Sequence, residues 1–186
     1  IGLSAGNYTI TITDQNNCFT TGDIEVKEPD VLDIAPLGFD SASCNGVSDG
    51  IAFVGGVTGV TGGNGSVYSY TWTDALGVDL LQDNDTAVGL AAGVYDIRVE
   101  DSKLCFATGQ VTVDQPSSLS LTDTILDSAT CSTGGTVLVN VTGGTPNYSY
   151  LWDDGSNQTT DTAINLAAGI YKVVVTDNNG CQDSII

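Results

Sequence analysis

Apolar and polar residues alternate along short runs of this chain, and turn residues separate the runs. One run places Tyr95, Ile97 and Val99 at alternate positions, and a second run alternates in the same way from Tyr68 to Trp72. Side chains along a β-strand point to opposite faces in turn, so each run predicts a strand with one apolar face. No stretch of a dozen residues shows the apolar spacing of a helix. The pattern therefore predicts an all-β protein.

The arrangement of these runs predicts an immunoglobulin-like β-sandwich. Turn signals recur roughly every eight to twelve residues, which is typical of sandwiches with about seven short strands. Trp72 is expected to lie buried between the sheets, and the alternation gives little support to the alternative of an exposed platform for a sugar. The expected strands are 31–35, 50–54, 68–72, 86–90, 94–100 and 110–113, with a variable loop through Leu80 and Leu81.

The strongest feature of the sequence is an internal repeat. Three segments align without gaps, from Gly6 to Cys18, from Gly93 to Cys105 and from Gly169 to Cys181. Each has Tyr at its third position, Asp at its ninth and Cys at its thirteenth. Self-similarity of this kind indicates tandem copies of one module.

The repeat divides the chain into three modules, with boundaries near two prolines. Pro29 stands fifteen residues before Cys44, and Pro116 stands fifteen before Cys131. We call the three parts the first, second and third modules. They are expected to be the C-terminal part of a truncated module at 1–29, a complete module at 30–116, and a module lacking its last strand at 117–186.

The five cysteines fit this division as one disulfide in each module. We expect Cys44 to pair with Cys105 and Cys131 to pair with Cys181, which leaves the partner of Cys18 outside the sequence. One such bridge would stabilise a module by roughly 4 kcal/mol. Disulfides persist in oxidising compartments, so an exported protein is predicted. Zinc is not expected, because two isolated Cys per module and no His cannot supply four ligands.

The charge of the chain excludes two classes of partner. There are 23 Asp and Glu against 4 Lys and Arg, a formal net charge of −19. Nucleic-acid binding requires a basic surface, and anionic membranes repel an acidic one. No apolar run approaches the roughly 18 residues of a membrane-spanning helix. The excess of carboxylates is typical of a long protein kept soluble by repulsion between molecules.

Catalysis is not expected of this sequence, and neither is a cofactor. The chain has no His, so a His-dependent triad cannot form and acid–base chemistry would fall to carboxylates. Paired acids such as Asp153 and Asp154 follow a strand at a predicted turn, where solvated acids are common. Carboxylates could instead hold a structural calcium ion, because calcium prefers carboxylate oxygens. Its weak candidate ligands are Asp79, Asp83 and Asp85.

The third module resembles a known family. It carries Val-Thr-Gly-Gly-Thr-Pro-x-Tyr-x-Tyr-x-Trp at 141–152 and Leu-x-Ala-Gly-x-Tyr-x-Val-x-Val-Thr-Asp-x-x-Gly-Cys at 166–181. This pattern resembles the SprB repeat of large gliding-motility and adhesion proteins on the surface of Bacteroidota. The resemblance covers essentially the whole chain, although Gly59–Val67 expands the Gly-Gly-Thr-Pro turn in the second module. It implies type IX secretion, an outer-membrane location, and adhesion to or movement over polysaccharide-rich surfaces.

A second resemblance concerns covalent modification. Asp followed by Ser or Thr and then by a small or aliphatic residue resembles the O-glycosylation acceptor motif of Bacteroidota. The same dipeptides also form good turns, so both explanations stay open. The acceptor hydroxyls would be those of Ser41, Thr86, Thr124, Ser128, Thr162 and Ser184.

These observations predict a structural stalk or filament segment of a secreted, SprB-like surface adhesin that acts in adhesion and gliding. Its expected partners are neighbouring modules of the same chain and surface polysaccharides. Two alternatives stay open. The modules could bind glycans themselves, through loops such as Gly59–Val67, or they could separate the domains of a large secreted hydrolase.

Overall fold

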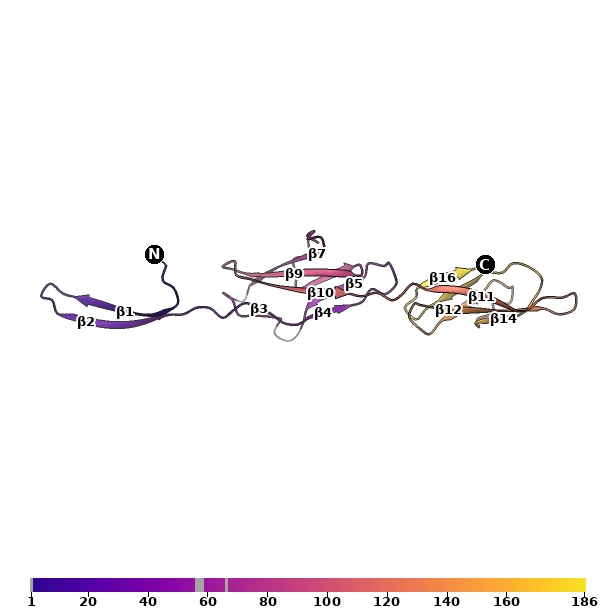
Figure 1. Ribbon diagram of the computed structural model, residues 1–186, viewed down its shortest axis with the longest axis horizontal. Coiled ribbons are helices and arrows are strands. Elements are labelled where there is room, and N and C mark those ends of the chain that lie inside the picture. The colour runs from indigo at the N-terminus through magenta and orange to yellow at the C-terminus, as the bar shows by residue number, and fades with distance from the viewer. Residues whose placement is uncertain (1, 56–58, 66) are drawn as a thin grey trace.

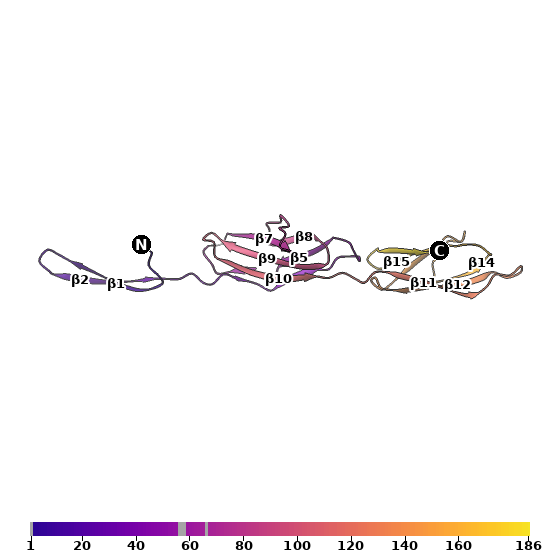
Figure 2. The same ribbon diagram turned by 45° about the horizontal axis from the view of Figure 1, so that its top comes forward.

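The computed structural model describes residues 2–55, 59–65 and 67–186, and every helix or strand assigned in these ranges is a β-strand. The predicted all-β class is therefore confirmed. No helix long and apolar enough to cross a membrane occurs in the described residues. In both views of the ribbon, a hairpin and two groups of sheets follow one another along the long axis (Figures 1 and 2).

The first module forms a single antiparallel hairpin. Strand β1 (Gly6–Thr13) pairs with β2 (Phe19–Val26) over its whole length, from Gly6 opposite Val26 to Thr13 opposite Phe19. Its apolar side chains Ile10 and Ile12 are exposed. The residues at the same repeat positions in the second module, Ile97 and Val99, are buried. The difference shows that a second sheet is needed to cover the apolar face of this hairpin.

The second module contains two three-stranded antiparallel sheets and one short pair. One sheet has the order β4-β5-β8, the other has the order β10-β9-β7, and β3 pairs with β6. The strands are β3 (Asp33–Ile34), β4 (Leu37–Asp40), β5 (Gly50–Val54), β6 (Val60–Thr61), β7 (Tyr68–Asp74), β8 (Thr86–Leu90), β9 (Gly93–Asp101) and β10 (Phe106–Val113).

The core of the second module lies between these two sheets. Trp72 is fully buried, which confirms the prediction made for it and argues against an exposed sugar platform. The alternation along β9 is confirmed in the same way, since Tyr95, Ile97 and Val99 all lie inside. The buried core consists of Ala52, Val54, Ala87 and Leu90 from one sheet and Trp72, Tyr95, Ile97, Val99, Val111 and Val113 from the other.

The third module repeats this sandwich with longer strands at one edge. Its sheets have the orders β11-β12-β14 and β13-β15-β16. Its core contains Val139, Trp152, Ala163, Leu166, Val173 and Val175. The strands are β11 (Ser120–Asp127), β12 (Gly135–Thr142), β13 (Ser149–Trp152), β14 (Thr162–Leu166), β15 (Val173–Thr176) and β16 (Gln182–Ile185).

Polar groups of the repeated aromatic residues are satisfied in the same way in each copy. The indole N–H of Trp72 donates to the backbone oxygen of Asn84, and that of Trp152 donates to Thr160, each at 2.9 Å. The Tyr of the Gly-x-Tyr motif donates its hydroxyl to the backbone oxygen four residues earlier in all three modules. A buried indole or phenol requires such a partner, and these bonds supply it to Trp72, Trp152 and Tyr95.

Several details of the second module differ from the prediction, including the short strand β6, which the sequence pattern does not predict. The expected first strand at 31–35 is reduced to β3, and a strand that was not expected, β4, follows Pro36. The last strand also begins at Phe106, four residues earlier than expected, because it pairs with β9 along its whole length. The strands at 50–54 and 86–90 lie where the sequence predicts them.

Candidate functional site

The turn that ends at Cys181 is built around the side chain of Asp177, a buried residue of the third module. Its carboxylate accepts backbone N–H groups of Thr145 at 2.8 Å and of Asn179 and Cys181 at 2.9 Å. These bonds, led by that of Thr145, lower the pKa of Asp177 against the opposing effect of burial. A carboxylate with several backbone donors fixes the turn and therefore the position of the cysteine at its end.

The second module holds Cys105 in the same kind of turn. The carboxylate of Asp101 accepts backbone N–H groups of Asn64 at 2.7 Å, Lys103 at 2.8 Å and Cys105 at 3.0 Å. Burial alone would raise the pKa of Asp101, but these hydrogen bonds outweigh it and lower the pKa to about 2. The first module repeats the turn, because the carboxylate of Asp14 accepts the N–H of Cys18 at 2.9 Å.

The other cysteine of the second module, Cys44, lies in a loop after β4 at the opposite end of the sandwich. The backbone N–H of Ala42 donates to Asp114 at 2.8 Å, and Asp49 accepts the N–H of Ser43 at 2.8 Å. The hydroxyl of Ser43 also donates to Asp49, and this bond is the leading cause of the lowered pKa of Asp49. These contacts place the loop beside the end of β10, where the chain leaves the module.

The same loop also binds the linker to the third module. The side-chain amide of Asn45 donates to the backbone oxygen of Pro116 at 3.1 Å, and the N–H of Gly46 donates to the side chain of Gln115 at 2.7 Å. Each of these bonds joins residues about seventy positions apart. The loop and the linker therefore form one structure at the junction of the two modules.

A disulfide joins Cys44 of the second module to Cys181 of the third, with their Cα atoms 5.8 Å apart. Next to the bridge, the side-chain amide of Asn179 donates to the backbone oxygen of Ser43 at 2.9 Å. The Asp177 turn and the loop after β4 thus meet face to face. The remaining cysteines, Cys18, Cys105 and Cys131, are exposed and form no disulfide within the described part of the chain.

This pairing corrects the sequence prediction of one disulfide inside each module. Cys44 was expected to pair with Cys105, and Cys131 with Cys181. The physical reason lies in strand β9, because Cys105 follows its last residue while Cys44 lies near its first. Nine residues of strand span roughly 25 Å, whereas bridged Cα atoms lie no more than about 7 Å apart. The two cysteines of one module face opposite neighbours.

The six candidate glycosylation residues have two kinds of environment. Ser41, Thr124, Ser128 and Ser184 are exposed, although Thr124 also accepts a hydrogen bond from the Asn140 side chain at 3.3 Å. Thr86 and Thr162 are half-buried at the starts of β8 and β14. Each of these two donates its hydroxyl to the preceding Asp at 3.0 Å. Glycosylation stays a prediction, with the exposed serines as the most accessible acceptors.

The calcium candidates gain no support from their arrangement. Asp79 accepts the N–H of Leu81 at 2.8 Å, and Asp83 and Asp85 are exposed near the start of β8. Among the described residues, no group of three or more His, Cys, Asp or Glu side chains could hold a metal ion. Calcium binding therefore stays a prediction without a site.

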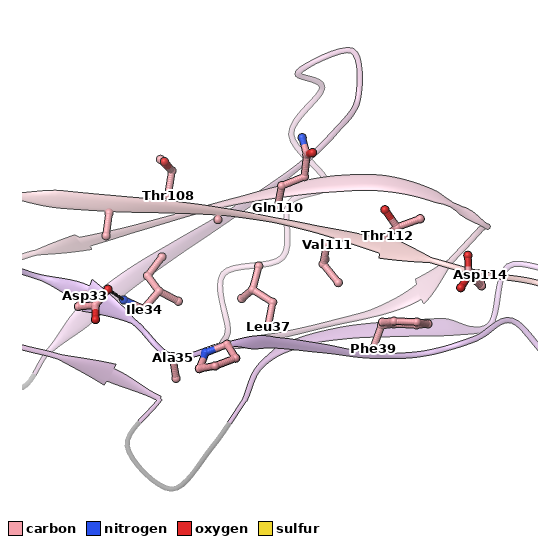
Figure 3. A pocket seen from close by; sticks show the side chains of 13 residues that line it. Asp33, Ile34, Ala35, Leu37, Phe39, Thr108, Gln110, Val111, Thr112 and Asp114 are labelled. Carbon is pink, nitrogen blue, oxygen red and sulfur yellow. Dashed lines mark hydrogen bonds between the residues drawn. The ribbon is translucent and has the colours of Figure 1, made fainter.

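The candidate glycan-binding loop, Gly59–Val67, contains Ser66, which lies outside the described residues. A separate groove runs between β10 and the edge formed by β3 and β4, and its floor is made by Ile34, Leu37 and Val111 (Figure 3). Gln110 and Thr112 on its rim point away from it in this view. Sugar sites need polar groups that converge on the ligand, and these two side chains do not converge on this groove.

Comparison with known proteins supports the family resemblance. The family model of the SprB repeat matches residues 124–157, which run from within β11 through β13 to the turn after Trp152. This match confirms the SprB-repeat resemblance that the sequence suggested. The SprB repeat is a structural repeat typical of cell-surface proteins. A search of curated proteins finds no match to the chain.

Proposed function

We propose that this chain is a stalk segment of a large secreted surface adhesin of the SprB type, and that it serves adhesion and gliding by extending other parts of that protein away from the cell. The bridged junction between the second and third modules carries this proposal. A stalk requires modules that keep a fixed relation to their neighbours, and the junction combines a disulfide, the Asn179 hydrogen bond and the bonded linker.

The SprB match and the charge support the same function. Modules that each bury their own core can be added in series, so length is gained by repetition. The formal charge of −19 keeps neighbouring stalks from associating. The role proposed here is mechanical, so it requires no pocket on the modules themselves.

The test uses antibodies raised against this chain and applied to intact cells of the organism that makes it. We expect surface labelling, together with loss of surface attachment and gliding when the segment that encodes the modules is deleted. Labelling only after cell lysis would contradict the surface location. Full adhesion after the deletion would contradict the stalk role, and loss of a secreted hydrolase activity instead would favour the alternative of a spacer in such an enzyme.

A further inference from the structure

The disulfide between Cys44 and Cys181 closes a loop that spans 137 residues and crosses the boundary between two modules. Every strand from β5 to β15 lies inside this loop. Only β1 to β4 and β16 lie outside it. A bridge inside one module would reinforce that module alone, whereas this one connects the end of one sandwich to the start of the next.

Cys105 is presented in the same way as Cys181. Both end a turn in which a buried Asp, four residues earlier, accepts the cysteine N–H, at 3.0 Å and 2.9 Å respectively. The residue before each cysteine has a positive φ, 67° at Leu104 and 86° at Gly180. We call the end at which the chain enters a module its entry end, and the opposite end its exit end. Cys105 is therefore held at the entry end of the second module, as Cys181 is held at the entry end of the third.

Cys131 has the position in the third module that Cys44 has in the second. Each precedes a strand that begins with a buried glycine, Gly50 in β5 and Gly135 in β12. These glycines face Leu90 and Leu166, which occupy the same repeat position. Cys131 is exposed at the exit end of the third module, where a following module would attach.

We propose that the bridge is one link of a repeating connection, in which the exit cysteine of each module joins the entry cysteine of the module after it. This inference rests on the tandem-array part of the proposed function and not on adhesion. Each link forms when two thiols lose two protons and two electrons. A disulfide oxidant of the exporting compartment accepts the electrons by thiol–disulfide exchange and becomes a dithiol.

The connection changes how an array responds to tension. Force applied at the two ends of this chain reaches residue 44, passes through the bridge and continues from residue 181. The 137-residue loop carries no tension, because the bridge bypasses it. Even if its strands unfold, the loop does not add to the length of the stretched chain. In an array, successive bridges overlap in sequence, and each module lies within loops closed by its neighbours.

Single-molecule stretching of this chain between end handles tests the first link. Full extension of the reduced chain should exceed that of the oxidised chain by about 480 Å, since an extended residue spans about 3.5 Å. The oxidised Cys44→Ser variant should reach the reduced length. The matched control is Cys131→Ser, which removes the corresponding cysteine of the third module and should keep the short length.

A third variant separates this connection from bridges inside modules. Cys105→Ser should leave the oxidised length unchanged, whereas a Cys44–Cys105 bridge would lengthen this variant by about 210 Å, for a loop of about 60 residues. That lengthening would overturn the proposal. The measurement compares fully extended lengths, so a bridge that has formed is detected whether or not the strands of the variant have separated.

Peptide mass spectrometry of the unreduced, thiol-blocked native protein tests the repetition. We expect both Cys105 and Cys131 in linked peptides. Cys105 should be joined to the exit cysteine of the module before it, and Cys131 to the entry cysteine of the module after it. Blocked thiols at both positions, or a link to the partner cysteine of the same module, would overturn the repeating connection. Surface labelling of cells is a separate readout, so failure of this inference is distinguishable from failure of the proposed function.

Discussion

The second and third modules differ at the edge where the first strand of each lies. In the second module this strand is split into β3 and β4, and the backbone N–H of Gly55 donates to Pro36 at 3.1 Å across the break. In the third module, β11 runs unbroken from Ser120 to Asp127. Proline cannot donate to a sheet ladder, so Pro36 accounts for the break.

Behind these different edges the two cores share their central residues. Trp72 and Trp152 are both buried and both donate to a backbone oxygen, and Ala87 and Ala163 are both fully buried. The comparison shows that this repeat keeps its interior and its cysteine-bearing ends while the edge strands vary. Changes inside the core should therefore have equal effects in both modules, and changes at the edges should not.

The largest effect is expected from breaking the bridge that joins the two modules. On the chain-entropy estimate, a loop of 137 residues is worth about 5 kcal/mol of unfolding free energy. Cys44→Ser and Cys181→Ser should each lower stability in denaturant titrations by up to that amount. Cys105→Ser and Cys131→Ser should change little, and equal loss in all four variants would contradict a bridge between modules.

Truncating the buried tryptophans tests whether the two cores are equivalent. Trp72→Ala should lower the unfolding free energy of the second module by about 3–5 kcal/mol, since it leaves a large cavity. Trp152→Ala should do the same to the third module. Circular dichroism follows both transitions, and the fluorescence of the remaining tryptophan reports on the unmutated module. A much smaller cost in one module would show that its core packs differently.

The Asp101 turn should make the second module sensitive to acid. Its folded pKa of about 2 lies below the unfolded value of about 3.9, so the carboxylate stabilises the fold above pH 4. That contribution should disappear as the pH falls from about 4 to about 2, lowering the melting temperature. Asp101→Asn should be less stable at pH 7 and should show a flatter profile. The exposed Asp83→Asn is the control, and a steep profile in Asp101→Asn would contradict this role.

The smallest effect is expected at the residue before the entry cysteine. Leu104 has a φ of 67°, and its side chain is 74% exposed. Leu104→Gly should stabilise the second module by roughly 0.5 kcal/mol, because relief of left-handed strain slightly exceeds the added chain entropy. The reciprocal change, Gly180→Leu, should destabilise the third module by a similar amount. Thermal melts measure both, and a loss of stability in Leu104→Gly would show that the strain is absent.

Sequence alone predicts the parts of this fold that depend on local patterns. Alternation places Trp72 and the β9 residues in the core, and the spacing of Asp and Cys reveals the repeat. Strand β4 is missed because Pro36 and Gly38 interrupt its apolar pattern. A signal for the Asp turn is present, since an Asp precedes Cys18, Cys105 and Cys181 by four residues.

The disulfide pairing could not be predicted from spacing, because the sheet topology decides which end of a sandwich each cysteine occupies. A bridge inside one module and a bridge between successive modules both join one entry-end cysteine to one exit-end cysteine. The number and type of cysteines therefore do not distinguish the two pairings. The direction of β9 does separate them, since it carries the chain from beside Cys44 to Cys105. That direction follows from long-range strand pairing, which no local pattern records.

The linker and the bridge attach the third module to the second at two separate points. A body held by a single covalent connection can swivel about it, and a second attachment removes that torsional freedom. Successive modules would then keep one twist angle, and an array with the same angle at every junction would follow a helical path. Exposed residues at equivalent positions, such as Ser41 and Ser128, would then project from the array at directions that differ by the same angle from each module to the next.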